Sequence, residues 1–266
     1  MNAGAREFDA IVLAADRGPA DPVARAAGVP AKCLAPIAGT PMVARVVGAL
    51  EQSDRVHAIV LCGPPAEVLH GSAELTRLVE EHRLKWTANG ATPSTSAALA
   101  LSAVPADRRV LLTTGDHALL SPAMVRHFLD RAGDSDCDVV VALAPYPMVQ
   151  AAYPDTRRTV LKFSDGRFCS CNLFAFLTPR GRELAQVWTQ VEAQRKKPIR
   201  VVGLVGFGAM ALYAVGRLSL QGALRRLSNK MRLRLGVVEM PFAEASIDVD
   251  KVDDLDLVRR IAQRQA

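Results

Sequence analysis

The sequence contains few aromatic residues and few cysteines, and it has no apolar run long enough to cross a membrane. Aromatic residues make up 5% of the 266 residues, and cysteines number five. Only Cys169 and Cys171 lie close together, and no CxxC pairs with a second CxxC or an HxxxH, which argues against a disulfide framework and a structural zinc site. The apolar stretch Val201–Gly216 spans 16 residues, whereas a transmembrane helix needs about 20, so we expect a buried or interfacial helix there.

We expect no secretory signal at the N-terminus. The residues before Asp9 include Arg6 and Glu7 and contain no apolar segment of the kind that a signal peptide requires. The chain is 50% apolar and 23% charged, which is ordinary globular composition and argues against a disordered protein. We therefore expect a folded protein in the reducing cytoplasm.

Positive charge is concentrated in one part of the chain. The net charge is +6, but residues 180–234 contain twelve Lys or Arg and two Glu, a net of +10, which leaves a net of −4 for the rest. This asymmetry indicates an anionic partner, and it predicts peripheral contact with the inner face of an anionic membrane; a solvated helix face is the alternative. Nucleic-acid binding is not expected, because the basic segment lacks an aromatic platform for base stacking.

Short apolar runs alternate with helical patterns over the first 145 residues. Strands buried on both faces are expected at Ala10–Ala14, His57–Cys62, Arg109–Thr113 and Cys137–Leu143, and helices at Pro41–Glu51, Ala73–His82, Ser94–Val104 and Pro122–Ala132. This order predicts an α/β fold, a three-layer α/β/α Rossmann-like arrangement around a mostly parallel mixed sheet. Ligands are then expected beyond the carboxyl ends of the strands.

The second half of the chain departs from that alternation. Strand-like segments at Arg158–Phe163 and Phe168–Phe176 flank an Asp165-Gly166 turn, which predicts a hairpin insertion. Two helical candidates, a further strand and a closing helix follow at Arg180–Gln194, Val201–Leu227, Leu233–Val238 and Val252–Gln265.

Two segments near the N-terminus form a pattern. The first strand ends in Leu13-Ala14-Ala15 and leads into the turn-forming loop 16–19, and the motif K-C-L-A-P-I-A-G-T-P-M runs from Lys32 to Met42 into a helix. This arrangement resembles the nucleotidyltransferase superfamily with a glycosyltransferase-A-like fold, especially the branch similar to molybdenum-cofactor nucleotidyltransferases. In that family a strand ends in LAAG, and a glycine-rich loop precedes K-x-L-x-P-x-x-G-x-P-M.

The resemblance implies an NTP site around these segments. Loop N–H groups and one lysine can hold a triphosphate and stabilise the charge on departing pyrophosphate. Lys32 matches the family's lysine. The other nucleotide-binding residues implied here are Ala14, Ala15, Arg17, Gly18 and Gly115. Asp16 stands where the family has glycine, so a metal or Arg17 would have to offset its charge.

Acidic residues match the family's magnesium site. An apolar strand delivers Asp116 in the sequence Gly-Asp-His, where the family places an aspartate on a catalytic Mg²⁺, and a packed His117 is expected beside it. Residues 245–255 resemble the family's D-x-D-T-P-E-D-L segment, which makes Asp250 the second ligand and Asp248, on the same strand face, an alternative ligand. Carboxylates suit Mg²⁺, which takes one or two of them together with substrate phosphates.

Two further segments resemble substrate-binding parts of the family. Residues 89–96 resemble the G-x-x-x-S loop that meets the base and ribose, with Gly90 and Ser94 at the matching positions and Ser96 close by; a capped helix start explains the same residues. Asn172 resembles an acceptor-side asparagine, and Arg158 or Lys162, with Arg157 as a further candidate, would receive the acceptor's phosphate.

Together these residues predict a Mg²⁺-dependent nucleotidyltransferase. A phosphorylated acceptor would attack the α-phosphorus of an NTP, with CTP or GTP favoured, and release pyrophosphate. The acceptor would be a lipid-headgroup precursor or a sugar or alcohol phosphate. We expect a single NTP-transferase domain over residues 1–266, with a nucleotide-binding half at 1–143, an acceptor-side insertion at 144–240 and a metal-completing strand end and closing helix at 241–266.

Two alternatives remain at this point. A glycosyltransferase of the same fold usually has a D-x-D motif at the end of a mid-chain strand, whereas Asp134, Asp136 and Asp138 precede a strand. A non-catalytic nucleotide-binding relative would explain Asp16. The sequence makes no prediction of the oligomeric state.

Overall fold

An eight-stranded mixed β-sheet lies at the centre of the protein. The computed structural model describes residues 6–15, 20–82, 84–193 and 207–265. The strands of this sheet are β1 (Phe8–Leu13), β4 (Val56–Cys62), β5 (Lys85–Thr87), β6 (Arg109–Thr114), β7 (Val139–Pro145), β8 (Leu161–Phe163), β9 (Gly166–Phe176) and β10 (Leu235–Glu239). A separate two-stranded sheet pairs β2 (Pro36–Ile37) with β3 (Thr40–Pro41).

Helices connect the strands. They are α1 (Pro22–Ala27), α2 (Met42–Glu51), α3 (Ala66–Gly71), α4 (Ala73–Glu81), α5 (Pro93–Ser102), α6 (Pro122–Gly133), α7 (Tyr146–Ala152), α8 (Leu184–Ala193), α10 (Phe207–Ala214), α11 (Leu220–Met231) and α12 (Val252–Gln265). Short 3₁₀ helices are η1 (Lys32–Leu34), η2 (Arg180–Glu183) and η3 (Ala243–Ser246). The four strands and four helices predicted for the N-terminal half are all present, with ends that differ by a few residues.

The sheet is mixed but mostly parallel, as predicted. Its strands lie in the order β10-β7-β9-β6-β1-β4-β5, and β8 pairs with β9 outside this path. β1 is parallel to β4 and β6, β5 is parallel to β4, and β10 is parallel to β7. β9 is antiparallel to β6, β7 and β8.

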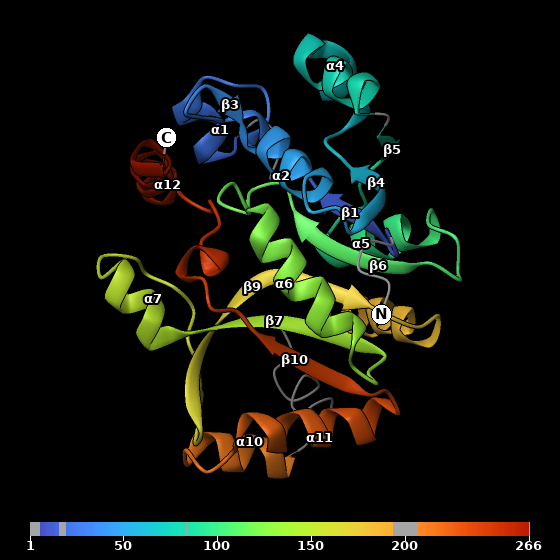
Figure 1. Ribbon diagram of the computed structural model, residues 1–266, viewed down its shortest axis with the longest axis vertical. Coiled ribbons are helices and arrows are strands. Elements are labelled where there is room, and N and C mark those ends of the chain that lie inside the picture. Colours follow the sequence, from blue (N-terminus) through green and yellow to red (C-terminus); the bar gives the residue numbers. More distant parts are fainter. Residues whose placement is uncertain (1–5, 16–19, 83, 194–206, 266) are drawn as a thin grey trace.

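Helices cover both faces of the sheet and confirm the three-layer arrangement (Figure 1). Successive side chains of a strand point to opposite faces. Val12 therefore packs in the core on the side of α2 and α6, whereas Ile11 packs in the core on the side of α5 and α8. Both side chains are fully buried, so β1 is a strand with no solvent-exposed face, which is why its residues 10–13 form a continuous apolar run.

The predicted hairpin is only part of a longer strand. β8 and the start of β9 pair across the Asp165-Gly166 turn, as expected. The remainder of β9 continues between β6 and β7 in the middle of the sheet. The hairpin is thus the extension of a central strand. In the central part of β9, Leu173 and Ala175 are buried in the core on one face of the sheet, and Phe176 is buried in the core on the other face.

The described part of the predicted helix Val201–Leu227 forms two short helices, α10 and α11, in place of one long one. Residues 201–206 of the predicted helix Val201–Leu227 lie outside the described residues. α10 ends before Gly216, which has a φ of +67°, and the Ser219 hydroxyl then caps α11 by accepting from the Gly222 N–H at 3.0 Å. No helix within the described ranges is long and apolar enough to cross a membrane.

Candidate active site

The carboxyl end of β1 lies where the strand order of the sheet reverses. β1 pairs with β4 on one side and with β6 on the other, and ligands of open α/β sheets bind in the crevice that this arrangement leaves. Ala14 and Ala15 follow β1 at this point. A Cβ atom on Gly63 would lie 3.0 Å from the Ala15 nitrogen, and one on Gly115 would lie 3.3 Å from the Ala14 Cβ, so glycines are needed for this close approach.

The described part of the chain includes three of the five loop residues predicted to bind the nucleotide beside Lys32. Ala14, Ala15 and Gly115 lie together at the end of β1 and β6. Arg17 and Gly18, together with the unusual Asp16, lie outside the described residues.

Lys32 brings its ammonium group to the loop that follows β6. Its Nζ forms an ion pair with Asp116 Oδ2, donates to the Val249 carbonyl at 3.1 Å and lies 3.9 Å from Asp250 Oδ1. The Val249 N–H donates to the Asp116 carbonyl at 3.1 Å, which ties the late acidic segment to this loop. The structure therefore brings together Lys32, Asp116 and Asp250, which come from three distant parts of the sequence.

The charge of Lys32 is set by its partners. Burial lowers the pKa of Lys32, but the charge of Asp116, the hydrogen bond to it and the charges of Asp250 and Asp21 outweigh that effect and raise the pKa above its ordinary value. Lys32 is therefore a cation at neutral pH. Its side chain is only 13% exposed, so its field is weakly screened by solvent.

The acidic residues around Lys32 fit a metal held by two carboxylates. Asp116 Oδ1 is buried and has no hydrogen-bond partner among the described residues, and the Asp250 side chain is 58% exposed. Two carboxylates that face one cation are the protein contribution that Mg²⁺ usually takes, with phosphates and water completing its coordination. Within the part of the chain that the structure describes, no three His, Cys, Asp or Glu side chains gather as a metal site.

Asp248 does not join this pair. Its carboxylate forms an ion pair with Arg158 and accepts from Asn172 Nδ2 at 2.5 Å. A guanidinium already neutralises Asp248, so Asp116 and Asp250 are the remaining candidates for metal ligands.

His117 is packed, as the sequence predicts. Its side chain is 1% exposed, and burial lowers its pKa to about 4. The ring is therefore neutral at pH 7 and adds no charge beside Asp116.

The loop before α5 is closed by its own hydroxyl groups. The Gly90 N–H donates to Ser96 Oγ at 3.0 Å, and the hydroxyls of Ser94 and Thr92 lie 3.1 Å apart. Ser94 and Ser96 are buried, so they shape the loop from within, while Gly90 and its neighbours remain partly exposed. The Glu192 carboxylate of α8 accepts from the Ser94 N–H at 3.1 Å. The loop is thus a capped helix start that is held by hydrogen bonds, and it leads into α5, which packs against β1 and β4.

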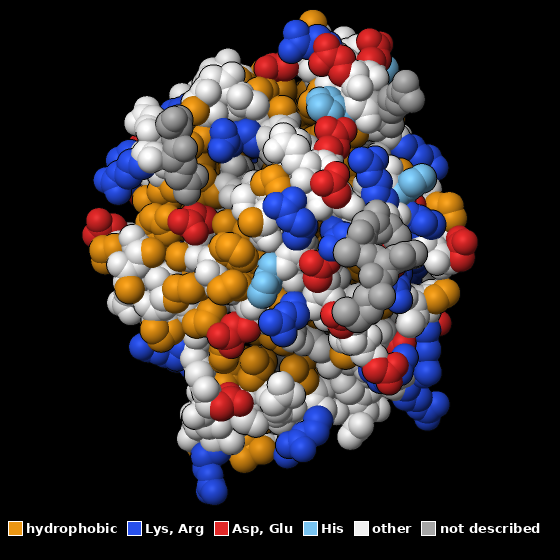
Figure 2. Space-filling view, in the orientation of Figure 1, with side chains coloured by type: hydrophobic (Ala, Val, Ile, Leu, Met, Phe, Trp, Pro, Cys, Tyr) orange, Lys and Arg blue, Asp and Glu red, His pale blue; other side chains and the backbone are white. Residues whose placement is uncertain are grey.

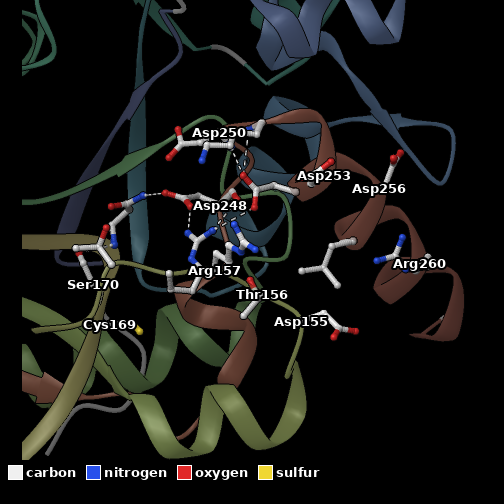
Figure 3. Close-up of a pocket in the computed structure, with 16 residues that line it drawn as sticks. Asp155, Thr156, Arg157, Cys169, Ser170, Asp248, Asp250, Asp253, Asp256 and Arg260 are labelled. Carbon is white, nitrogen blue, oxygen red and sulfur yellow. Dashed lines mark hydrogen bonds and ion pairs between the residues drawn. The ribbon is translucent and has the colours of Figure 1, made fainter.

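A polar cavity of about 780 Å³ opens beside Asp250. It lies between β9 and α12: Figure 3 shows Ser170 on one side, Asp256 and Arg260 on the other, and Asp248 between them. The lining consists almost entirely of polar and charged side chains, namely Asp155, Thr156, Arg157, Arg158, Thr159, Ser170, Asn172, Asp248, Asp250, Lys251, Asp253, Asp254, Asp256 and Arg260, with Cys169 and Leu257.

Asn172 reaches this cavity because β9 is distorted there. The pairing of β7 with β9 shifts between Val141 and Leu143, and Asn172 has a φ of 49°. Asparagine tolerates this left-handed conformation better than most residues, and such a bulge redirects a side chain. Asn172 therefore points at Asp248, and Arg158 binds both Asp248 and Asp254, at 3.6 Å in the second case.

The structure does not bring Lys162 to the cavity. Lys162 lies on β8, exposed to solvent, with its backbone N–H donating to the Tyr213 hydroxyl at 3.2 Å. Lys162 was predicted as a phosphate contact alongside Arg158, but it is not among the residues that line the cavity. The mid-chain acids lie elsewhere too: Asp138 is buried before β7 and is bonded to Thr178 and Arg234.

Several residues that line the cavity were not predicted from the sequence. Four of them lie on α12, namely Asp253, Asp256, Leu257 and Arg260. The last three follow Asp253 by three, four and seven positions, a spacing that puts all four on one helix face, so the sequence did contain a pattern that could have identified them. The contacts of the Val249 carbonyl and of Glu192 could not be predicted from a local pattern. Val249 contacts Lys32, which is 217 residues away, and Glu192 contacts Ser94, which is 98 residues away.

Comparison with known proteins identifies the family and the fold. Residues 10–234 match the family described as "MobA-like NTP transferase domain". A structure described as a hypothetical transferase from Thermus thermophilus superposes with a TM-score of 0.76 at 28% identity, covering 94% of this chain and 99% of that one.

Two curated proteins are similar over about half of the chain. The 2-C-methyl-D-erythritol 4-phosphate cytidylyltransferase of Saccharopolyspora erythraea is 36% identical over 140 residues, which are 51% of this chain and 59% of that protein. The bifunctional protein GlmU of Sphingopyxis alaskensis is 35% identical over 142 residues, 52% of this chain and 29% of that protein. The chain therefore matches less than two thirds of the length of either relative.

Proposed function

The chain belongs to the family of MobA-like NTP transferase domains, and from this premise we propose that it transfers a nucleoside monophosphate from an NTP to a phosphorylated acceptor. The observation that carries the proposal is the meeting of Lys32, Asp116 and Asp250 at the end of β6, between the β1 loop and the polar cavity. A donor bound on the loops and an acceptor bound in the cavity would face each other across these three side chains.

The donor side favours CTP as the first nucleotide to test. The curated relative from Saccharopolyspora erythraea is named as a cytidylyltransferase. In this chain the triphosphate would lie against the backbone at Ala14 and Ala15, and the base would lie against the loop that begins at Gly90. Lys32 would donate to a phosphate oxygen, so its charge would stabilise the negative charge that develops on pyrophosphate.

The acceptor side favours a small phosphorylated polyol or sugar. Carboxylates of the cavity can accept hydrogen bonds from hydroxyl groups, and guanidinium groups bind phosphate. Arg158 is held by Asp248 and Asp254, whereas Arg157 and Arg260 form no ion pair among the described residues and are the candidates for phosphate binding. The lining has a single aliphatic side chain, Leu257, so a lipid tail would find little apolar contact inside the cavity.

The reaction needs no general base. An acceptor phosphate is ionised at neutral pH, so one of its oxygens attacks the α-phosphorus, and the bond to the bridging oxygen of the β-phosphate breaks as pyrophosphate leaves. This chain would position the two substrates and offset their charge. Mg²⁺, when bound, would neutralise phosphate oxygens and help to align the attacking and leaving groups, with Asp116 and Asp250 as the residues that hold it.

Pyrophosphate release tests the proposal. The protein would be incubated with Mg²⁺, each of the four NTPs in turn and a pool of phosphorylated polyols, sugars and alcohols, with the same compounds lacking phosphate as the control. We expect release with CTP and the phosphorylated pool only. NTP binding without release would support a non-catalytic relative. In a parallel reaction supplied with nucleotide-sugars in place of NTPs, consumption of a nucleotide-sugar would support a glycosyltransferase.

Gly90→Ala is expected to weaken nucleotide binding. A Cβ on Gly90 would lie 3.0 Å from the Ser96 backbone nitrogen, so the loop must shift to accept it. We expect the KM for CTP to rise about tenfold, roughly 1.4 kcal/mol, with kcat little changed, because Lys32 and Asp116 are untouched. The matched control is Gly71→Ala, where a Cβ meets nothing within 4 Å. An unchanged KM would remove this loop from the nucleotide site.

A further inference from the structure

Exposed apolar side chains gather on α10 and the turn that follows it. Four large apolar side chains among the described residues are exposed, and three of them lie within six residues: Met210 at 40%, Tyr213 at 37% and Val215 at 66%. Clusters of this kind on a protein surface usually mark an interaction site.

This apolar patch is fixed firmly to the rest of the molecule. Ala209 of α10 is buried, and the Tyr213 ring contacts Phe163 of β8 edge-on with the ring centroids 5.9 Å apart. α11 packs against β10 at the edge of the sheet. The patch therefore has a defined position and is not a loose end of the chain.

Exposed basic side chains lie on the same segment as the patch. Residues 207–234 contain no acidic residue, and all six of their basic side chains are exposed, namely Arg217, Arg225, Arg226, Lys230, Arg232 and Arg234. A Cβ on Gly208 would lie 4.0 Å from Arg226 Nη1, so the charges of α11 lie directly beside α10. Figures 1 and 2 place these helices along the lower edge of the molecule, where Lys and Arg side chains lie among hydrophobic ones.

We propose that the surface formed by α10 and α11 docks the protein on an anionic lipid bilayer. Met210, Tyr213 and Val215 would enter the boundary between headgroups and acyl chains, and the arginines around them would contact lipid phosphates. An apolar patch beside a row of exposed basic residues matches this partner, whereas nucleic acid offers no apolar layer to cover the patch. The inference goes beyond the proposed function and does not depend on it, because docking needs neither NTP nor acceptor.

Vesicle flotation tests the proposal with the full chain. Vesicles of phosphatidylcholine with about one-third phosphatidylglycerol supply the anionic surface, and pure phosphatidylcholine vesicles are the neutral control. We expect binding to the anionic vesicles at low salt, and its loss in high salt as the charges are screened. The double variant Arg225→Glu and Arg226→Glu should bind at least about 25-fold more weakly, from about fivefold for each basic side chain.

A second variant separates insertion from charge attraction. Met210→Ser with Val215→Ser keeps every charge and should weaken vesicle binding about tenfold, because two apolar side chains no longer enter the bilayer. Arg77→Glu with Arg131→Glu, which changes two exposed arginines away from this surface, is the matched control and should bind like the original protein.

Four results would overturn the proposal. The first two are no binding to anionic vesicles at low salt and an equal loss of binding in the control variant. The third is a dimer in solution that Val215→Asp dissociates while vesicles are not bound, which would assign the surface to a second copy of this chain. The fourth is competition by duplex DNA at equal affinity, which would assign the surface to nucleic acid.

Discussion

Replacing Asp116 by Asn is expected to lower kcat for pyrophosphate release by about 10³-fold or more. The substitution keeps the size of the side chain but removes the charge that faces Lys32 and, in our proposal, the metal. Asp116 Oδ1 has no hydrogen-bond partner among the described residues, so no neighbouring group there can replace the lost charge of Asp116. Steady-state kinetics with CTP and the phosphorylated acceptor would measure the effect.

Thermal unfolding would separate lost chemistry from lost structure. Asp116→Asn leaves Lys32 with the Val249 carbonyl and a more distant Asp250, so a modest fall in Tm is expected with a folded protein. Asp134→Asn changes an exposed acid at the end of α6 and should leave both kcat and Tm unchanged. A variant at Asp116 that is folded and retains a tenth of the activity would remove this residue from the metal site.

Replacing Lys32 by Ala is expected to lower kcat/KM for CTP by about 10²- to 10³-fold. The variant loses a cation that is held near the triphosphate by partners which raise its pKa. It also leaves a largely buried Asp116 carboxylate without its cation, which should cost about 3–5 kcal/mol of the free energy of unfolding.

Magnesium gives this variant a readout that does not involve turnover. With the ammonium removed, Asp116 and Asp250 are both available to a metal, so Mg²⁺ should raise the Tm of Lys32→Ala more than that of the original protein. Lys85→Ala, which alters an exposed lysine on β5, is the control and should show neither the kinetic loss nor the extra stabilisation. Equal effects of Mg²⁺ on all three proteins would contradict a metal site at these carboxylates.

Regular elements of the N-terminal half were predictable because their signals are local. β1 and β6 are buried on both faces and read as apolar runs, and α2 has one apolar stripe. The short elements α1, β5 and α7 were not predicted, because six, three and seven residues carry too little periodicity.

The second half was harder to predict because its structure depends on distant partners. β9 has the sequence of a hairpin strand at its start, yet its position between β6 and β7 depends on pairing with strands about 30 and 60 residues earlier. The break between α10 and α11 depends on Gly216 and Ser219, whose roles at a helix end and a helix start are compatible with many other conformations.

The sequence by itself determined the α/β class, the strand β6 that leads into Asp116, and the motif that contains Lys32 and places the chain in its family. Only the tertiary structure decided which acids meet. The sequence predicted that Asp248 and Asp250 lie on one strand face, with Asp250 the closer match by spacing, but residues 247–251 do not form a strand. Arg158 and Asn172 reach Asp248, while Asp250 lies beside Lys32. The strength of an ion pair depends on distance and burial, and both are set by how remote segments pack against each other.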